Sequence, residues 1–451
     1  MLRLLNMVTV LGARLFRHRI LLVVLLPVML VVTLHLKFHL DTSRRLPTPW
    51  WIRGEVTGNC SPQHNVAFLK SHKCASSAAQ NIFFRYGLKH NLHFALPFVG
   101  NYFGGGLRPF NADMLKASPW NKLGVNIMAV HMKWDHQQVK KVMPLDTAFV
   151  SIVRDPIELF ESLYTYVKMD KAYHMTVEEF ALNVSIDAPR HMGYIGYNQM
   201  VWDFGIPDQK QIYNLTHVSQ LVREAEEKFD LVMVAERMEE SQVLLSHLLC
   251  WDLRDVIVLK LNARSSKFKK AMSKESQKVL HDKLAPDYLL YRTFVKRLDE
   301  LVEDFGRKRM AREITRLRAL TKQLMDTCEF TKVSSNLMTG ANKPWSSMVD
   351  GYKPSAGSSK CQQFSRSELS FINLLRGLQK SEVSRRFGLP DSLGLDALPL
   401  GPQLFENPAN LTNRINALKK MLVYKENVAK ESGVSGPSTI ATVETAALGE
   451  K

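Results

Sequence analysis

Two segments of the chain carry residues that could bind phosphate groups. In the first, residues 65–85, a short apolar run leads into small and basic residues and then into a helical pattern starting near Ser76. Such a turn points backbone N–H groups and the positive end of the helix dipole at one spot, and Lys73 would add a full charge. The segment lacks the G-x-x-x-x-G-K-[ST] spacing of a Walker A loop. An ordinary strand–helix turn with exposed lysines is the alternative.

The second segment covers residues 147–166. The expected strand ends at Val153, and residues 155–158 have the D-P-x-E pattern of a helix start. Arg154 therefore leaves the carboxyl end of the strand, where open α/β sheets bind ligands. A guanidinium from Arg154 and a hydroxyl from Ser162, about two turns into the helix, could hold one phosphate from two sides. The alternatives are a surface ion pair for Arg154 and a solvent-facing polar side chain for Ser162.

Apolar runs that alternate with helical stretches must position these two segments. The runs typical of buried parallel strands are Val66–Leu69, Ala148–Val153, Leu231–Ala235 and Val256–Leu259. Helical patterns cover about residues 76–90, 156–168, 237–250 and 274–303. This alternation predicts an α/β domain over residues 64–305, with a parallel sheet covered by helices.

The C-terminal part of the chain has a different pattern. Residues 306–330 are charged and helical, residues 331–362 read as loop, and residues 363–385 regain helical spacing. We therefore expect a helical extension of the domain over residues 306–390. Residues 391–451 are expected to form a variable, partly disordered tail, whose last part, from Glu426, is small and polar.

The N-terminal part predicts the compartment. Residues 20–36 are uncharged and almost wholly apolar, which is the short end of a membrane-spanning length. No small-x-small cleavage site follows, so the pattern favours a signal anchor with residues 1–19 cytoplasmic and residues 37–63 a stem. The bulk of the chain would then be lumenal. A buried core helix is the alternative for residues 20–36.

The net charge, the glycosylation sequons and the cysteines narrow the possible partners and the compartment further. The formal net charge of +17 fits anionic partners in general, but no nucleic-acid-binding module or zinc-type spacing accompanies it, so we expect neither nucleic acid nor metal binding. N-x-Ser/Thr sequons at Asn59, Asn183, Asn214 and Asn410 agree with a lumenal body.

Of the five cysteines, Cys74 lies in the anion-binding loop and is expected to be unpaired. The other four, Cys60, Cys250, Cys328 and Cys361, allow three disulfide connectivities.

The two phosphate-binding segments together resemble a known family. The H-K-C-A-S-S loop at residues 72–77 is similar to the 5'-phosphosulfate loop of Golgi carbohydrate sulfotransferases, and R-D-P-x-x-x-x-x-S at residues 154–162 to their 3'-phosphate segment. The resemblance is strongest to the galactose-3-O-sulfotransferase family, which includes the cerebroside sulfotransferase. It extends over about residues 64–375. The blocks that carry it are residues 68–90, 131–134, 229–245, 248–256, 260–264 and 305–313.

This resemblance implies roles for individual residues. Lys73 matches the lysine on the 5'-phosphate and bridging oxygen, and Arg154 and Ser162 match the clamp on the 3'-phosphate. His131 matches the catalytic base, with His72 as a second candidate base or orienting residue. The donor-binding loop would comprise Lys70, Ser71, Lys73, Cys74, Ala75, Ser76 and Ser77. The family usually has threonine where this chain has Cys74, so one hydroxyl contact would be lost.

Two further regions are assigned less directly. Arg264 and Ser265 lie in a strongly basic stretch that could fold over the nucleotide near its 3'-phosphate, or could be a solvated loop. A stretch similar to the family's acceptor side contains Asn198, Trp202 and Asp203, which could bind a sugar by hydrogen bonds and ring stacking. Core packing is the alternative for Trp202.

The resemblance implies a P-loop-like sulfotransferase domain on a type II Golgi membrane anchor. The expected reaction moves a sulfonate group from 3'-phosphoadenylyl sulfate (PAPS) to the 3-hydroxyl of a β-linked galactose on a glycolipid or glycoprotein. A Golgi sulfotransferase acting on a uronic acid or another sugar position is one alternative. A lumenal glycoprotein that binds nucleotide or glycan without catalysis is another.

Overall fold

The computed structural model describes residues 60–387, with gaps at 260–271, 345, 347–348 and 356. The predicted anchor at residues 20–36, most of the stem and the predicted tail lie outside the described residues. Within the described part, no helix combines the length and the apolar character that crossing a bilayer requires.

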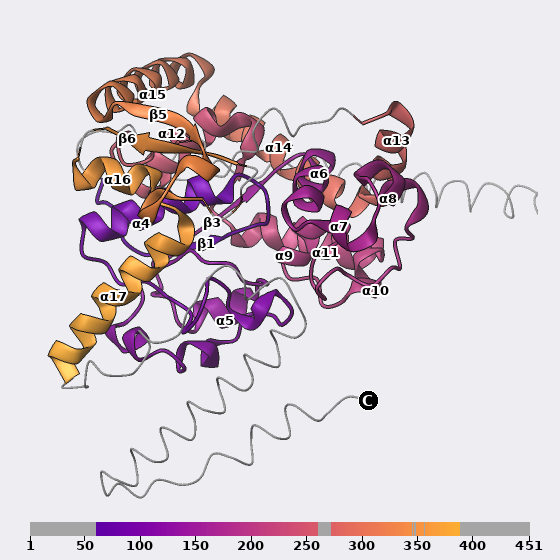
Figure 1. The fold of residues 1–451 in the computed structure, drawn as a ribbon, viewed down its shortest axis with the longest axis horizontal. Coiled ribbons are helices and arrows are strands. Elements are labelled where there is room, and N and C mark those ends of the chain that lie inside the picture. Colours follow the sequence, from indigo (N-terminus) through magenta and orange to yellow (C-terminus); the bar gives the residue numbers. More distant parts are fainter. Residues whose placement is uncertain (1–59, 260–271, 345, 347–348, 356, 388–451) are drawn as a thin grey trace, which may run out of the picture.

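A parallel sheet of four strands lies at the centre of the molecule (Figure 1). Its strands are β1 (Val66–Leu69), β2 (Ile127–Met128), β3 (Ala148–Val153) and β4 (Leu231–Val234). Every residue of β1 and β4 is buried, as expected for strands covered by helices on both faces. The predicted α/β class with a parallel sheet is confirmed.

The strand order β2-β1-β3-β4 creates a switch point between β1 and β3. The chain leaves β1 to form β2 on one side and then crosses back to form β3 on the other side. Val66 pairs with Ala148 and Leu69 with Ser151, so the carboxyl ends of the two strands lie next to each other. In open α/β sheets, ligands bind in the crevice at such a reversal.

Helices surround the sheet and account for most of the remaining described chain. They are α4 (Ser76–Lys89), α5 (His136–Lys140), α6 (Pro156–Tyr166), α7 (Met169–Tyr173), α8 (Val177–Asn183), α9 (Gln199–Asp203), α10 (Gln209–Ile212), α11 (Leu215–Lys228), α12 (Met238–Leu249), α13 (Lys274–Lys283), α14 (Ala285–Phe305), α15 (Arg307–Cys328), α16 (Ser359–Ser365) and α17 (Glu368–Phe387). The single helix expected over 274–303 is two helices, α13 and α14. The break comes just before Pro286, which cannot donate a backbone hydrogen bond.

The strand predicted at residues 256–259 was wrong. This stretch is buried but belongs to no sheet. Side chains, rather than a neighbouring strand, form hydrogen bonds to two of its carbonyls. The amide of Gln242 donates to the carbonyl of Val256, and the guanidinium of Arg85 donates to the carbonyl of Ile257. Two carbonyls of this apolar run are therefore satisfied without a strand partner.

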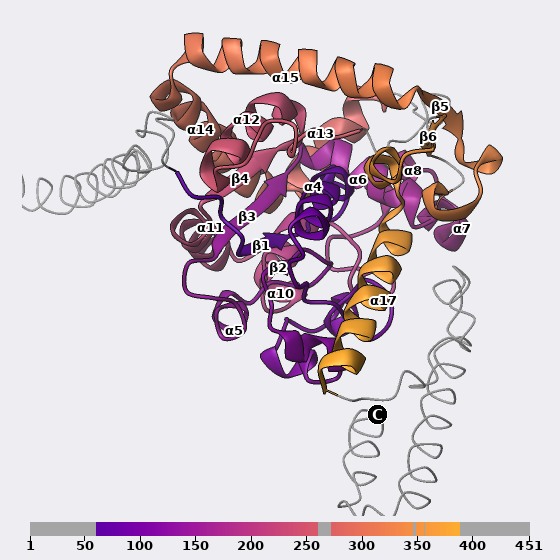
Figure 2. The ribbon, with the colours of Figure 1, turned by 90° about the vertical axis from the view of Figure 1, so that its left-hand side faces the viewer.

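The loop predicted at residues 331–362 was wrong in part. It contains an antiparallel hairpin of β5 (Phe330–Ser334) and β6 (Asp350–Pro354), followed by α16. A disulfide between Cys328 and Cys361 joins the end of α15 to α16. Helix α17 then lies beside α4 (Figures 1 and 2), where Phe371 packs on Phe84 with ring centroids 5.3 Å apart. The extension is thus packed onto the central domain.

A second disulfide fixes the start of the described chain. Cys60 is bonded to Cys250, which directly follows α12. Nearby, the backbone N–H of Gln63 donates to the carbonyl of Leu249, and the indole of Trp251 donates to the carbonyl of Gln63. The segment before β1 is therefore joined to the end of α12. Cys74 is unpaired, as expected, and fully buried.

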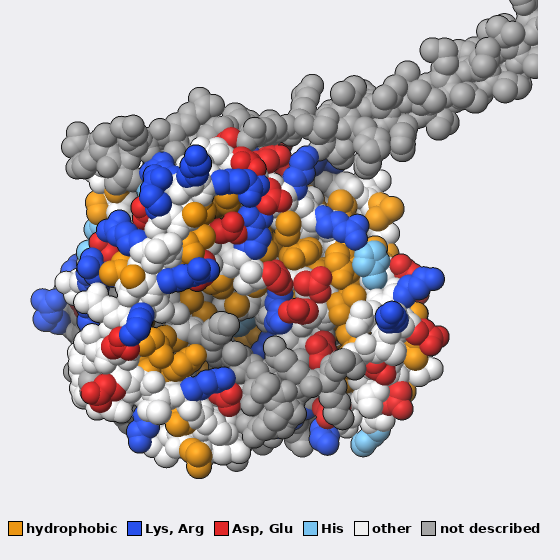
Figure 3. Space-filling model, turned by 90° about the horizontal axis from the view of Figure 1, so that it is seen from above, with side chains coloured by type: hydrophobic (Ala, Val, Ile, Leu, Met, Phe, Trp, Pro, Cys, Tyr) orange, Lys and Arg blue, Asp and Glu red, His pale blue; other side chains and the backbone are white. Residues whose placement is uncertain are grey.

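The charged side chains of the surface are mixed in sign. On the face shown in Figure 3, lysine and arginine side chains alternate with aspartate and glutamate. Arg318 of α15, for example, is paired with Glu239 of α12 at 2.6 Å. The basic surplus of the chain does not form a continuous basic surface on this face.

Candidate active site

The loop after β1 has the backbone of an anion-binding turn. Lys73 and Ala75 both have positive φ, 56° and 58°, so the chain curls tightly before α4 begins at Ser76. No side chain caps that helix start. The hydroxyl of Ser76 instead donates to the carbonyl of Ser71, which closes the loop. The N–H of Ala78 in the first turn donates to the carbonyl of Ala75, which leaves the N–H groups of Ser76 and Ser77 for a ligand, and the helix dipole favours an anion there.

The segment after β3 reaches this loop directly. The guanidinium of Arg154 donates to the carbonyl of Lys73 at 3.0 Å and to the carboxylate of Glu158 at 2.8 Å. The ammonium of Lys73 lies 3.7 Å from the ring centroid of Tyr166, near the end of α6. Ser162 is half-buried on the same helix, one turn before Tyr166. The two predicted phosphate-binding segments therefore meet at one place.

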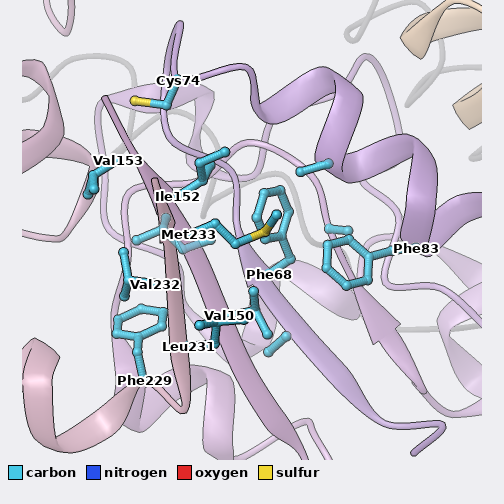
Figure 4. Packing of buried hydrophobic residues seen from close by; sticks show 14 of the residues in the cluster. Phe68, Cys74, Phe83, Val150, Ile152, Val153, Phe229, Leu231, Val232 and Met233 are labelled. Atoms are coloured by element: carbon cyan, nitrogen blue, oxygen red, sulfur yellow. The ribbon is translucent and has the colours of Figure 1, made fainter. Parts of the chain in front are cut away.

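Cys74 is inside the loop rather than facing a ligand. Its side chain lies at the end of the core beside Val153, the last residue of β3 (Figure 4). Its thiol is 3.3 Å from the carbonyl of His72, and burial raises the pKa of Cys74 well above its ordinary value. The thiol therefore stays protonated and buried against the sheet.

His72 is held by a buried carboxylate. Nδ1 of His72 lies 2.8 Å from Oδ2 of Asp203, which also accepts from the backbone N–H of His72 at 2.7 Å. Nε2 lies 2.8 Å from the hydroxyl of Tyr102, and burial raises the pKa of that phenol well above its ordinary value, so it keeps its proton. The amide of Gln199 donates to Asp203 at 2.9 Å, and Arg190 donates to Gln199 at 2.8 Å. These contacts assign the proton of His72 to Nδ1 and a lone pair to Nε2.

His131 belongs to a second, adjoining cluster. The ammonium of Lys70 donates to Nε2 of His131 at 2.8 Å and to the hydroxyl of Ser77 at 3.3 Å, and it pairs with Glu368 at 3.1 Å. Glu368 also accepts from the side-chain amide of Asn101 at 2.8 Å. Burial is the main cause that holds the pKa of His131 well below the ordinary histidine range, and the neighbouring Lys70 and His72 lower it further. His131 is therefore neutral.

Stacking joins the two clusters. The ring of His131 stacks on two others, with centroids 4.5 Å from His72 and 4.6 Å from Tyr102, and the centroids of these two lie 5.8 Å from each other. Burial would raise the pKa of Glu368, but Lys70 and the hydrogen bonds from Asn101, Lys70 and Ser77 outweigh it, and the pKa lies below its usual value. The carboxylate of Glu368, the ammonium of Lys70 and the imidazoles of His72 and His131 thus share one buried site.

The chain matches a described family along most of its length. A family model described as galactose-3-O-sulfotransferase covers residues 1–373. The chain belongs to the galactose-3-O-sulfotransferase family. It is 34% identical to the galactosylceramide sulfotransferase of Homo sapiens over 279 residues, 60% of this chain and 65% of that protein. The chain thus aligns with just under two thirds of that relative.

Two other relatives align over more of their length. Galactose-3-O-sulfotransferase 3 of Mus musculus is 31% identical over 367 residues, which cover 75% of this chain and 84% of that protein. Galactose-3-O-sulfotransferase 2 of Homo sapiens is 33% identical over 319 residues, 68% of this chain and 77% of that protein. This family of sulfotransferases implies PAPS as the sulfonate donor.

The loop of this galactose-3-O-sulfotransferase family member fits such a donor. Ser71 is fully buried, and its hydroxyl has no hydrogen-bond partner among the described residues. Together with the uncapped start of α4 and the adjacent Arg154, it offers donors and positive charge to a ligand with phosphate groups at two positions. Arg264 and Ser265, predicted near the 3'-phosphate, lie outside the described residues. Within the described ranges, no group of three His, Cys, Asp or Glu side chains could hold a metal ion.

The residues predicted to bind the acceptor have structural partners. Asn198 is fully buried, and its side chain contacts Tyr213, the carbonyl of Lys283 and the backbone N–H of Asp287. The sugar-binding role of Asn198 stays a prediction.

The other two predicted acceptor residues are also buried and have partners of their own. Trp202 is buried, and its indole N–H donates to the carbonyl of Gly106. The cations of Lys133 and Arg190 lie 3.6 and 4.4 Å from its ring centroid. Asp203 holds His72. The sugar-binding role of Trp202 and Asp203 stays a prediction.

Sequence reasoning missed three residues of the site. Asn101 and Tyr102 lie in the irregular segment between α4 and β2 and follow no strand that could single them out. Glu368 lies about 290 residues from the loop it contacts, in a helix with no motif around it.

Proposed function

We propose that the protein transfers a sulfonate group from PAPS to the 3-hydroxyl of a β-linked galactose on a glycolipid or glycoprotein glycan. The observation that carries this proposal is the hydrogen bond from Arg154 to the carbonyl of Lys73. It brings two anion-binding segments together at the switch point of the sheet. One nucleotide with phosphates at its 3' and 5' positions can then contact both. Family membership supports the sugar class.

The chemistry follows from the charges around the loop. As the galactose oxygen forms a bond to sulfur, the bond from sulfur to the bridging oxygen breaks and negative charge grows on the departing 5'-phosphate. Lys73 and the backbone N–H groups at the start of α4 would stabilise that charge, and they contribute more in the transition state than in the ground state. Arg154 and Ser162 would hold the 3'-phosphate and so fix the donor's direction.

A histidine base would take the proton of the attacking hydroxyl. The sequence favours His131, but its Nε2 already accepts a hydrogen bond from Lys70. The contacts favour His72, because Asp203 holds its Nδ1 and leaves the Nε2 lone pair facing the hydroxyl of Tyr102. A substrate hydroxyl that replaced this phenol would meet a base whose cation Asp203 stabilises. We therefore assign proton transfer to His72 and an orienting role to His131.

Sulfonate transfer from radiolabelled PAPS tests the proposal. The full-length protein in detergent would be offered galactosyl lipids, galactosyl oligosaccharides and uronic-acid polymers. We expect label on the 3-hydroxyl of galactose, with little on the other sugars. Transfer to uronic acid alone would reject the galactose assignment, and PAPS binding without transfer to any acceptor would reject the enzyme.

We also propose that the enzyme is a type II Golgi membrane protein anchored by residues 20–36. The apolar run in the sequence and the two disulfides support this topology, since disulfides persist in oxidising compartments. Protease treatment of sealed microsomes should leave residues 60–387 intact. Cleavage of that part without detergent would contradict the proposed topology.

A further inference from the structure

We propose that Glu368 is a positioning residue of the reaction centre, which makes the C-terminal helix α17 part of the catalytic machinery. This inference rests on the proposed sulfonate transfer. The carboxylate of Glu368 is distant in sequence from the residues that it contacts. Glu368 opens α17, far from every segment that the motifs single out, yet its side chain is only 12% exposed and points into the loop after β1.

The carboxylate of Glu368 links four separate segments. Its Oε2 pairs with Lys70 at 3.1 Å and accepts from Ser77 in the first turn of α4 at 3.2 Å. Its Oε1 accepts from Asn101 at 2.8 Å and lies 3.9 Å from Nε2 of His131. The backbone carbonyl of Asn101 in turn accepts from the backbone N–H of His131 at 3.0 Å. Both the side chain and the backbone around His131 thus depend on this one carboxylate.

These contacts fix the direction of the Lys70 ammonium. An ammonium has three N–H donors, and the structure provides three acceptors, on Glu368, His131 and Ser77. Lys70 is only 2% exposed, so water cannot replace a lost partner. Without Glu368, the ammonium could turn away from His131, and the stacked histidines would lose the contact that holds them.

A carboxylate at this position does not help to bind the donor. It contacts Ser77, at the helix start where a phosphate would bind, and like charges repel. Glu368 should therefore weaken the ground-state affinity for the anionic nucleotide while it improves the geometry for transfer. Loss of the carboxylate should therefore lower kcat and leave nucleotide affinity unchanged or higher. A purely structural residue would not produce this combination.

The test compares Glu368→Gln, Glu368→Asp and Glu368→Ala in the full-length protein. We expect Glu368→Gln to lower kcat about 10- to 100-fold, with the KM for PAPS and the Kd for adenosine 3',5'-bisphosphate unchanged or lower. Glu368→Ala should lower kcat further, and Glu368→Asp should restore part of it. The matched control is Glu382→Gln, on the same helix, where the carboxylate pairs with His93 and Arg386 away from the site. That variant should keep wild-type kcat.

A double-mutant cycle with Lys70→Met separates positioning from general destabilisation. If Glu368 acts through Lys70, Glu368→Gln should lower kcat much less in the Lys70→Met protein than it does in the wild-type protein. Full additivity, wild-type kcat in Glu368→Gln, or a loss confined to PAPS binding would each overturn the inference. An inactive wild-type protein would instead reject the proposed function, so the two failures are distinguishable.

Discussion

The donor loops and the histidine clusters lie side by side but are built in different ways. The loops after β1 and β3 present backbone groups and cations from two contiguous segments that meet through Arg154 and Lys73. The clusters around His72 and His131 are built from side chains of distant segments, including Asp203 and Glu368. The groups proposed to bind phosphate are thus fixed largely by local backbone, whereas the groups proposed to move a proton depend on long-range packing. The following predictions test this difference.

The largest loss is expected in the side-chain region. His72→Ala removes the proposed base and should lower kcat about 10²- to 10⁴-fold. Asp203→Asn should come close to this, because an amide no longer fixes the proton of His72 on Nδ1 or stabilises the imidazolium. Initial rates at saturating PAPS measure both. Full activity of His72→Ala, with loss in His131→Ala alone, would return the base assignment to His131.

The donor loops should respond mainly through PAPS. Arg154→Ala removes the guanidinium that joins the loops, and kcat/KM for PAPS should fall about 100- to 1000-fold. Arg154→Lys should recover little, since an ammonium lacks the fork that reaches both Lys73 and Glu158. Arg318→Ala, which breaks an exposed ion pair on α15, is the control and should leave kcat/KM unchanged. An unchanged KM in Arg154→Ala would contradict the clamp.

The disulfide between Cys328 and Cys361 should couple stability to turnover. Replacing both cysteines by serine opens a loop with a sequence separation of 33 and should cost about 4 kcal/mol of unfolding free energy. Because this bridge anchors the segment that leads to α17, kcat should fall about tenfold while PAPS binding persists. Thermal melts and calorimetric titration with adenosine 3',5'-bisphosphate measure the two effects. Equal losses of binding and turnover would argue against a separate C-terminal contribution.

Acid should destabilise the histidine cluster. The pKa of His131 is lowered by burial and then by Lys70 and His72, so the unfolded chain binds more protons than the folded one below the ordinary histidine pKa. Stability should therefore be lost as pH falls through about 6.5 toward the folded-state pKa. His131→Gln should show a shallower fall in melting temperature over this window. An equal fall in melting temperature in the wild-type protein and in His131→Gln would indicate that His131 does not take up a proton on unfolding.

The smallest effect is expected at Cys74. Its thiol faces the carbonyl of His72 rather than the helix start, so Cys74→Thr should change kcat/KM by less than about fivefold. In the native protein the thiol should not react with alkylating reagents, because it is buried and its pKa is raised. Rapid modification of the folded wild-type protein would contradict the buried placement.

The sequence predicted most of the sheet and the two segments after β1 and β3 that meet in the structure. Strands β1, β3 and β4 are short apolar runs with clear ends, and the residues after β1 and β3 carry local signals for turns and helix starts. These signals are local, so they can be interpreted without knowledge of the fold. Strand β2 has only two residues and shows no pattern, and residues 256–259 show a strand pattern but satisfy their backbone with Gln242 and Arg85.

The proton-transfer side could be predicted only in part. His72, His131 and Asp203 were recognised as chemically suitable, but which nitrogen is available on each histidine depends on Asp203, Lys70 and Tyr102. Glu368 could not be found, because its contacts arise from how α17 packs on α4, and no local pattern encodes that packing.

The bridge between Cys60 and Cys250 has a mechanical consequence. Any pull along the polypeptide that precedes residue 60 passes through a covalent bond to the end of α12 before it reaches β1. The backbone contacts of Gln63 share that load. Strand β1, which leads into the loop that carries Lys73, is therefore shielded from forces that act on the chain before Cys60.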